Sequence, residues 1–211
     1  MKPNENYAVT ARRDAKTAPI DDFPTPPWAT RALLTHVIKP HGTVWEPACG
    51  RCYMSVPLKE YFGASNVLST DKIDYGSPHQ DAGYDFVNDA ATVTNDVNWM
   101  ITNPPFSLAQ QFVVSAYNRG IRNVAILVRT QFLEGIGRYN DLYSWWPPAT
   151  VAQFSERVPM VEGRVDKDAS TATSYCWIIW RPLSGKDTNM VWIPPCRRSL
   201  EKDSDYIKRG Y

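Results

Sequence analysis

Short apolar runs rich in β-branched residues alternate with helix-like segments along this chain, and that alternation restricts the fold more than any other feature. Four of the runs predict buried strands, at residues 43–46, 67–70, 98–102 and 124–128. Helices are predicted before and between them, at about 26–38 with Thr25 as N-cap, at 53–62, and at 107–118 with Ser107 as cap. Strands that alternate with helices are typical of an open α/β sheet whose strands run parallel.

Two later runs predict the far end of the sheet. Residues 151–154 and 174–180 are strongly β-prone, and a long charged segment with a glycine separates them. Two strands joined in this way predict a hairpin whose loop reaches past the sheet edge, so the last strand is expected to be antiparallel. The predicted fold is therefore a Rossmann-like α/β sheet, mostly parallel, with helices on both faces.

The composition agrees with one domain. The chain has 211 residues, of which 43% are hydrophobic and 21% charged, which is enough for one core and too little for two. We expect a single domain over residues 21–193, a flexible arm at 1–20 and a peripheral tail at 194–211. A net charge of +1 means that any basic surface is local. No apolar run approaches the roughly 20 residues of a membrane span, so a cytoplasmic protein with no membrane partner is predicted.

The loop after the first strand has the pattern of a ligand-binding turn. It reads Glu46-Pro47-Ala48-Cys49-Gly50-Arg51-Cys52 and leads into the predicted helix at 53–62. Small residues at such a place let backbone amides approach a ligand, and the helix N-terminus favours negative charge such as an amino-acid carboxylate. The alternative is an ordinary strand-to-helix connection. Cys49 and Cys52 also form a C-x-x-C pair, but Cys176 and Cys196 are poorly placed to complete a zinc site, and no metal is predicted.

Two carboxylates follow the second strand. Asp71 stands directly after it, about 25 residues beyond the first loop, which is a spacing typical of an acid that accepts both hydroxyls of a ribose. Asp85 precedes Phe86 in a small hydrophobic island, where the carboxylate would accept from an adenine amino group and the ring would pack against the purine. An ordinary loop acid and a satellite hydrophobic cluster are the alternatives for these two positions.

The strand at 98–102 leads into Asn103-Pro104-Pro105-Phe106. Proline fixes its own backbone angle and pushes the residue before it out of the helical region, so this segment is predicted to be rigid and extended. The Asn103 side-chain oxygen is then placed to accept one hydrogen of an exocyclic amino group, and a proline carbonyl to accept the other. Phe106 offers a flat base a ring on which to stack. The alternative is a plain turn between a strand and a helix.

Five motifs in this order carry a family resemblance: Phe23-Pro24-Thr25-Pro26-Pro27, Glu46-Pro47-Ala48-Cys49-Gly50, Asp71, Asp85-Phe86 and Asn103-Pro104-Pro105-Phe106. Over roughly residues 22–182 the chain resembles the adenine-N6 DNA methyltransferases that use S-adenosylmethionine, and most of all the small Dam-like enzymes of bacteriophages and prophages. The resemblance implies a class I methyltransferase fold, S-adenosylmethionine as cofactor, DNA as partner, and methylation of adenine N6 as in restriction-modification systems. The target base would have to be flipped out of a duplex or already be single-stranded.

The resemblance also implies a role for each motif. Beside the methionine end of the cofactor it places Phe23, Thr25 and Pro26. Around the cofactor's amino group and backbone it places Glu46, Pro47, Ala48, Cys49 and Gly50. Asp71 would hold the ribose, Asp85 and Phe86 would hold the adenine, and Lys72 would also belong to the cofactor site. The segment that would accept hydrogen bonds from the target amine and stack on its base, with Phe106 as the stacking ring, is Asn103, Pro104, Pro105 and Phe106. Family members usually carry a second glycine where this chain has Cys52, which implies a wider loop or a slightly shifted cofactor.

Sequence recognition has no separate domain in a chain of this length. It would fall to the loops at 131–148 and 157–173, with four arginines as candidate contacts to DNA, or else as plain solvated residues: Arg129, Arg138, Arg157 and Arg164. The oligomeric state is left open between a monomer and a weak dimer. Other functions stay open as well, namely methylation of RNA bases, methylation of a protein glutamine, and binding of S-adenosylmethionine without catalysis.

Overall fold

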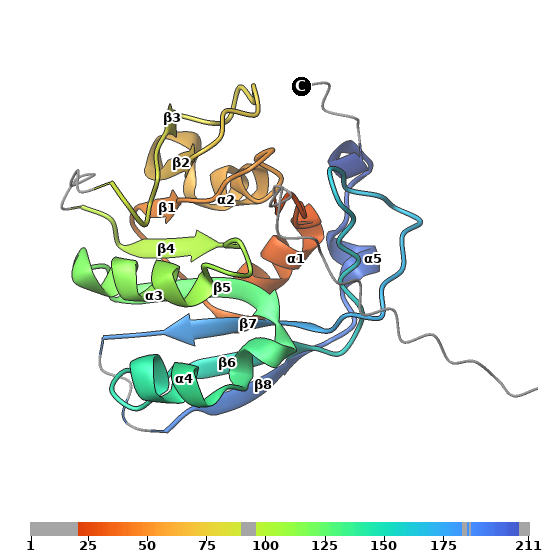
Figure 1. Ribbon diagram of the computed structural model, residues 1–211. Coiled ribbons are helices and arrows are strands. Elements are labelled where there is room, and N and C mark those ends of the chain that lie inside the picture. Colours follow the sequence, from red (N-terminus) through yellow and green to blue (C-terminus); the bar gives the residue numbers. More distant parts are fainter. Residues whose placement is uncertain (1–20, 90–95, 183–184, 186, 207–211) are drawn as a thin grey trace, which may run out of the picture.

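The computed structural model describes residues 21–89, 96–182, 185 and 187–206, and the predicted arm at 1–20 lies outside them. One sheet runs through the described chain, with helices on both of its faces (Figure 1). Its strands are β1 Val44–Glu46, β2 Val67–Asp71, β3 Ala82–Gly83, β4 Trp99–Thr102, β5 Asn123–Arg129, β6 Thr150–Phe154, β7 Tyr175–Trp180 and β8 Asn189–Ile193. The helical segments are α1 Pro27–Ala32, η1 Leu33–Val37, α2 Ser55–Phe62, η2 Ala64–Asn66, α3 Ala109–Asn118, η3 Thr130–Leu133, α4 Ile136–Arg138, η4 Tyr139–Tyr143, α5 Arg197–Leu200 and η5 Asp203–Tyr206.

The strand order is β3-β2-β1-β4-β5-β7-β6-β8. Neighbouring strands run parallel except at β7, which is antiparallel to both β5 and β6. Because β1 pairs with β2 on one side and with β4 on the other, the winding of the chain reverses between β1 and β4. In an open sheet of this kind, ligands bind outside the carboxyl ends of the strands at that reversal. The predicted fold is confirmed, and each predicted strand lies within one residue of its expected bounds.

Strand β5 shows why the sheet is covered on both faces. Val124, Ile126 and Val128 pack with α3 on one face, whereas Ala125 and Leu127 pack with α1 on the other. All five side chains are buried. Successive residues of a strand point to opposite faces, so a run that is apolar at every position needs a layer of helices on each side.

Each of the two predicted N-caps lies two residues before the first residue of its helix. The sequence predicts Thr25 as the N-cap of the first helix, but the helix begins at Pro27, because Pro26 precedes a proline and is held extended with a ψ of 128°. Thr25 caps nothing, and its buried Oγ1 has no hydrogen-bond partner among the described residues. Ser107 is also predicted as a cap, whereas α3 begins only at Ala109.

Strand β8 is absent from the sequence prediction. It pairs in parallel with β6 and forms one edge of the sheet. The pattern that would have indicated it is an alternation of exposed Met190 and Trp192 with the more buried Val191 and Ile193. A short strand with two exposed apolar side chains looks like an ordinary loop until a partner strand is known.

The segment after residue 193 is predicted to be a peripheral tail, yet part of it is fixed to the body of the protein. Asp205 is 2% exposed, and its two carboxylate oxygens accept from Arg31 of α1 at 2.7 and 2.9 Å. Arg31 also donates to Glu60 of α2, at 3.0 and 3.1 Å. One buried guanidinium therefore connects α1, α2 and the last described turn. No helix within the described ranges is both long and apolar enough to cross a bilayer.

Candidate cofactor and substrate site

The described residues form a cavity of about 400 Å³ at the carboxyl ends of β1, β2 and β4. It lies where the winding of the sheet reverses, and its volume falls within the range of about 300–1,000 Å³ typical of small-molecule sites. The predicted site residues that line it are Phe23, Thr25, Glu46, Ala48, Cys49, Gly50, Asp71, Lys72, Asn103 and Pro105. Pro26, Pro47 and Pro104 are not part of this lining. Segments far apart in the sequence thus converge on one volume.

The loop between β1 and α2 is held against β2 through its backbone. The Cys49 N–H donates to the Thr70 carbonyl at 2.9 Å, and the Gly50 N–H donates to the Asp71 carboxylate at 2.8 Å. Gly50 and Cys52 both have a positive φ, of 50° and 60°, and within the described ranges Cys52 is the only non-glycine residue with one. Cys52 therefore takes a conformation that favours glycine, at a cost of about 1–2 kcal/mol, and the wider loop or shifted cofactor stays a prediction.

The two thiols of this loop lie together. Both Sγ atoms are 3.8 Å from the Gly50 carbonyl oxygen, and both cysteines are free. A hydrogen bond with Cys49, supported by Ser77 and Ser55, lowers the pKa of Cys52 to about 7 although burial opposes this. The described residues gather no three His, Cys, Asp or Glu groups that would bind a metal ion. The Cys52 N–H donates to the Cys49 carbonyl at 2.7 Å, so the C-x-x-C pattern forms a hydrogen-bonded turn.

Two carboxylates line the inner part of the cavity. Glu46 is 1% exposed and accepts a hydrogen bond from the Ser55 hydroxyl, while burial and then the neighbouring Cys52 raise its pKa. Burial also raises the pKa of Asp71, whose oxygens accept from the backbone N–H groups of Gly50 at 2.8 Å and Ile73 at 2.9 Å. Each carboxylate oxygen has two lone pairs, so Asp71 keeps acceptors for two further hydroxyl groups.

The structure does not bring Asp85 and Phe86 to this cavity. Phe86 is 2% exposed and packs between Trp45 and Phe112, with ring centroids 4.8 and 5.1 Å away. Asp85 accepts from backbone N–H groups of its own turn and pairs with Lys72 at 2.9 Å. The hydrophobic island is thus part of the core, and its acid stabilises a turn. The adenine site predicted at these two residues is not formed.

Other residues line the cavity near Asp71. Ile73 and Tyr75 are among them, and the Arg51 guanidinium lies 5.4 Å from the Tyr75 ring centroid. Arg51 pairs in turn with Asp22 at 3.0 Å. Sequence reasoning missed these four residues. The available signal is position, because Arg51 belongs to the first loop and Tyr75 follows the strand-end acid by four residues.

Asn103 lies in the cavity wall just beyond β4, and its amide is held in one orientation. Nδ2 donates to the Phe23 carbonyl at 3.1 Å, with the Met160 sulfur at 4.0 Å. The opposite orientation would bring two oxygen acceptors together, so the Phe23 carbonyl fixes which way the amide points. Oδ1 is buried and has no partner within the described chain. An acceptor left unpaired in this way costs about 1–3 kcal/mol, so Oδ1 keeps its capacity to accept from a donor outside the described chain.

Phe106 faces a second, neighbouring cavity of about 200 Å³. Its backbone N–H donates to the Asp21 carboxylate at 2.7 Å. Its ring lies 6.1 Å from the Phe23 ring and 6.4 Å from the Tyr175 ring, centroid to centroid. The Arg129 guanidinium lies 4.2 Å from the Phe106 ring centroid. Asn103 and Phe106 therefore belong to two adjacent cavities, although three positions separate them in the sequence.

The four arginines predicted as DNA contacts divide into two pairs. Arg157 donates to the Ala172 carbonyl at 2.9 Å and to the Ser174 hydroxyl at 2.6 Å. Arg164 pairs with Asp166 at 3.1 Å. Arg129 and Arg138, in contrast, line the 200 Å³ cavity beside Phe106. The structure thus brings two of the four to the candidate site.

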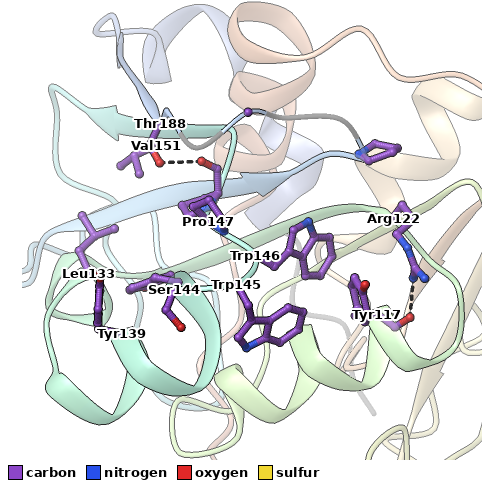
Figure 2. Close-up of a pocket in the computed structure, with 14 residues that line it drawn as sticks. Tyr117, Arg122, Leu133, Tyr139, Ser144, Trp145, Trp146, Pro147, Val151 and Thr188 are labelled. Atoms are coloured by element: carbon purple, nitrogen blue, oxygen red, sulfur yellow. Dashed lines mark hydrogen bonds between the residues drawn. The ribbon is translucent and has the colours of Figure 1, made fainter.

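A larger cavity of about 830 Å³ lies at the opposite ends of the strands, where β5 begins and β7 ends. Figure 2 shows the rings of Tyr117, Trp145 and Trp146 beside it, with Arg122 donating to the Tyr117 carbonyl. Its lining includes no predicted site residue and no carboxylate, and residues next to it in the sequence, 183, 184 and 186, are outside the described ranges. We assign the functional site to the 400 Å³ cavity, because the carboxylates, the oriented amide and the strand ends meet there.

Comparisons with known proteins concern the fold. No family model and no curated protein matches the sequence. Among solved structures, the methyltransferase subunit of a type I restriction-modification system from Streptococcus thermophilus has a TM-score of 0.56 and 14% identity, over 88% of this chain and 50% of that chain. The 23S rRNA methyltransferase ErmE has a TM-score of 0.50 and 16% identity, over 79% of this chain and 72% of that one. The chain thus spans half the length of the first of these structures.

The fold is that of a class I methyltransferase. At these identities the likeness establishes the architecture alone. In this class I methyltransferase fold, the β1 loop and the acid at the end of β2 meet at the reversal of the sheet, and Asn103 follows the adjacent strand β4. These are the positions to which the sequence motifs assign the cofactor and the target amine.

Proposed function

We propose that this protein transfers a methyl group from S-adenosylmethionine to the exocyclic N6 amine of adenine in DNA. One observation carries the proposal: Asn103 has a buried Oδ1 without a partner in the cavity wall, while its Nδ2 is tied to the Phe23 carbonyl. An acceptor fixed in this way fits a donor on the ligand. An aromatic amine has two such hydrogens, and the Pro104 carbonyl, next in the chain, is the second acceptor that we assign.

The chemistry asked of these residues is positioning. An exocyclic amine conjugated with its ring is a poor nucleophile, because its lone pair is delocalised. Acceptors at Asn103 and Pro104 that hold both hydrogens out of the ring plane favour a pyramidal nitrogen, whose lone pair can then aim at a methyl group. Orientation of this kind is worth up to about 7–11 kcal/mol of the barrier. Asn103 does not ionise, so the surplus proton leaves after the transfer, through the carbonyl acceptor or to water.

The cavity fits the proposed cofactor. S-adenosylmethionine supplies an activated methyl group on a sulfonium. The two hydroxyls of its ribose match the remaining lone pairs of Asp71, and its amino group matches the buried carboxylate of Glu46. Thr25 and Asp21 also line the cavity and each has a buried oxygen without a partner among the described residues. Unmet polar groups on several sides of one cavity fit a polar ligand better than an apolar one.

A base must leave its stack to reach Asn103. Unstacking costs a few kcal/mol, and stacking on an aromatic ring such as Phe106 returns about 1–3 kcal/mol. Met160, in the loop between β6 and β7, contacts the Asn103 amide, so entry of a base requires this loop to yield. We assign the whole activity to one domain, residues 21–193, acting in the cytoplasm as a monomer or a weak dimer, like the phage enzymes that the sequence resembles.

The test is product analysis with the full chain. Tritiated S-adenosylmethionine is incubated with unmethylated genomic DNA, with total RNA and with a protein extract, and the products are digested and separated by chromatography. The expected product is N6-methyladenine in DNA. Label only in RNA, or only in glutamine, would replace the proposed substrate with one of the alternatives. Cofactor binding by calorimetry without any labelled product would leave a binding module and overturn the enzymatic assignment.

A further inference from the structure

Two arginines line the same cavity as Phe106. Arg129 is the last residue of β5, and Arg138 is the last residue of the short helix α4. Both line the cavity of about 200 Å³, together with Phe106 and Phe132. This volume is below the range of about 300–1,000 Å³ that holds drug-sized ligands, and it suits a smaller group.

Each guanidinium is fixed in place by an aromatic ring. Arg129 lies 4.2 Å from the centroid of Phe106, and Arg138 lies 4.0 Å from the centroid of Phe132. One terminal nitrogen of Arg138 also donates to the carbonyls of Phe132, at 2.7 Å, and Glu134. A planar guanidinium held this way keeps its remaining edge in a constant direction, which is what a bidentate contact requires.

The charge of these two arginines is not compensated by a carboxylate. Within the described residues, neither Arg129 nor Arg138 is in a salt bridge with a carboxylate. The Nε atoms of both are buried and have no hydrogen-bond partner within the described chain. Two guanidinium cations that line one small cavity and are in no salt bridge favour a bound anion.

We propose that Arg129 and Arg138 bind a phosphodiester group of the nucleic-acid substrate, next to the nucleotide whose base occupies the Asn103 site. The proposal rests on the proposed function for its choice of anion, because the cavity shares Phe106 with the base-stacking position. A phosphate oxygen pair matches the fork of a guanidinium in geometry and charge. Arg157 and Arg164, whose donors are satisfied within the chain, are not assigned this role.

The test measures nucleic-acid binding separately from methylation. Arg129→Gln and Arg138→Gln are compared with Arg198→Gln, a control that removes the same charge from an exposed position outside both cavities. Binding of a fluorescent oligonucleotide is followed by anisotropy at several salt concentrations, with a non-reactive cofactor analogue present. Each cavity variant is expected to bind about tenfold more weakly. The slope of log K against log salt is expected to become shallower by about 0.7–0.9, which corresponds to one lost phosphate contact. The control is expected to leave both unchanged.

A second experiment removes the charge of one phosphate from the oligonucleotide instead of a charge from the protein. Oligonucleotides with one neutral methylphosphonate are scanned across the positions that flank the target adenine. One position is expected to weaken binding to the parent protein and to have no further effect on Arg129→Gln. If every position weakens the parent and the variant equally, or if the variants keep the slope of the control, the proposal is overturned. Phosphate ions that bind the parent and not the variants, with an unchanged nucleic-acid slope, would also overturn it. A shallower slope without methylation would contradict the proposed function and leave the phosphate site standing.

Discussion

The change Asn103→Ala separates the proposed role of this residue from a structural one. The substitution removes a hydrogen bond to the Phe23 carbonyl, of length 3.1 Å and worth about 0.5–1.5 kcal/mol. It also removes Oδ1, which is buried without a partner at a cost of about 1–3 kcal/mol. The two effects oppose each other, so the free energy of unfolding is expected to change by less than about 1 kcal/mol, or to rise. Loss of an acceptor that acts in the transition state is expected to lower kcat by about 10²–10³-fold, as removal of one oxyanion-hole donor does.

Asn98 offers a matched control at the other end of the same strand. Its Oδ1 accepts from the Thr43 N–H at 2.8 Å, far from the cavity, so Asn98→Ala is expected to lower stability by about 1 kcal/mol and to leave methylation at the parent rate. Stability is measured by urea unfolding, cofactor affinity by calorimetry, and the rate by single-turnover transfer of labelled methyl groups. An Asn103→Ala protein that binds cofactor normally and methylates at the parent rate would refute the acceptor role. A loss of more than about 2 kcal/mol of stability would show that the amide is structural.

Three further predictions concern Arg31, Cys52 and Asp71. Arg31→Met leaves the buried carboxylate of Asp205 unpaired and is expected to cost about 3–5 kcal/mol in urea unfolding. Lys167→Ala removes one partner of the exposed Lys167–Asp203 pair and is expected to leave urea unfolding nearly unchanged. Equal losses would contradict this account of the tail. Cys52→Gly is expected to be about 1 kcal/mol more stable than Cys52→Ala, since both lose the thiol and only glycine relieves the positive φ; the reverse order would show no strain there. Burial raises the pKa of Asp71, so Asp71 is expected to gain a proton, and cofactor affinity to fall, at a higher pH than for an exposed aspartate. Asp71→Asn is expected to flatten this dependence of affinity on pH. An unchanged dependence in the variant would remove Asp71 from the cofactor site.

The pH dependence of stability gives a separate check on the Arg31 network. Burial alone would raise the pKa of Glu60, but hydrogen bonds from Arg31 and Lys202 outweigh it and lower that pKa. A carboxylate with a lowered pKa in the folded state contributes stability that is complete above its ordinary value near 4.5 and is lost as the pH falls through the lowered value. Arg31→Met is therefore expected to make unfolding less sensitive to acid in this range. A parallel acid dependence in the variant would argue against the network.

Local sequence patterns determine the strands here because they depend on residues close together in the chain. β5 is apolar at five successive positions from Val124 to Val128, and that property alone requires a doubly covered strand. The N-caps are harder to predict, because a serine or threonine before a helix is only one of several ways in which a helix begins. At Thr25 the competing rule is that a residue before a proline is extended, and with two prolines in succession this rule moves the helix start to Pro27.

The candidate site could be predicted where a motif follows directly from a strand end, and not where it depends on packing. Glu46, Asp71 and Asn103 lie at or next to the carboxyl ends of adjacent strands, so topology alone brings them to one cavity. The island around Phe86 is a long loop segment whose direction depends on contacts with Trp45 and α3, which no local pattern specifies. An aromatic ring beside an acid fits a purine and a core equally well, and burial decided the outcome.

The buried polar atoms without partners place opposite demands on a ligand at the two neighbouring cavities. On the Asn103 side the unmet atoms include oxygens of Asn103 and Asp21, which call for donors. On the Phe106 side they are the Nε atoms of Arg129 and Arg138, and the charge of these two guanidinium groups favours an anion in the cavity that they line. A nucleotide within a strand carries an aromatic amine and a phosphate at a short distance from each other, and so meets both demands at once. A glutamine side chain meets only the first. Dependence of binding on Arg129 and Arg138 would therefore weigh against a protein substrate, and the choice between DNA and RNA would then fall to the groups that recognise the sugar.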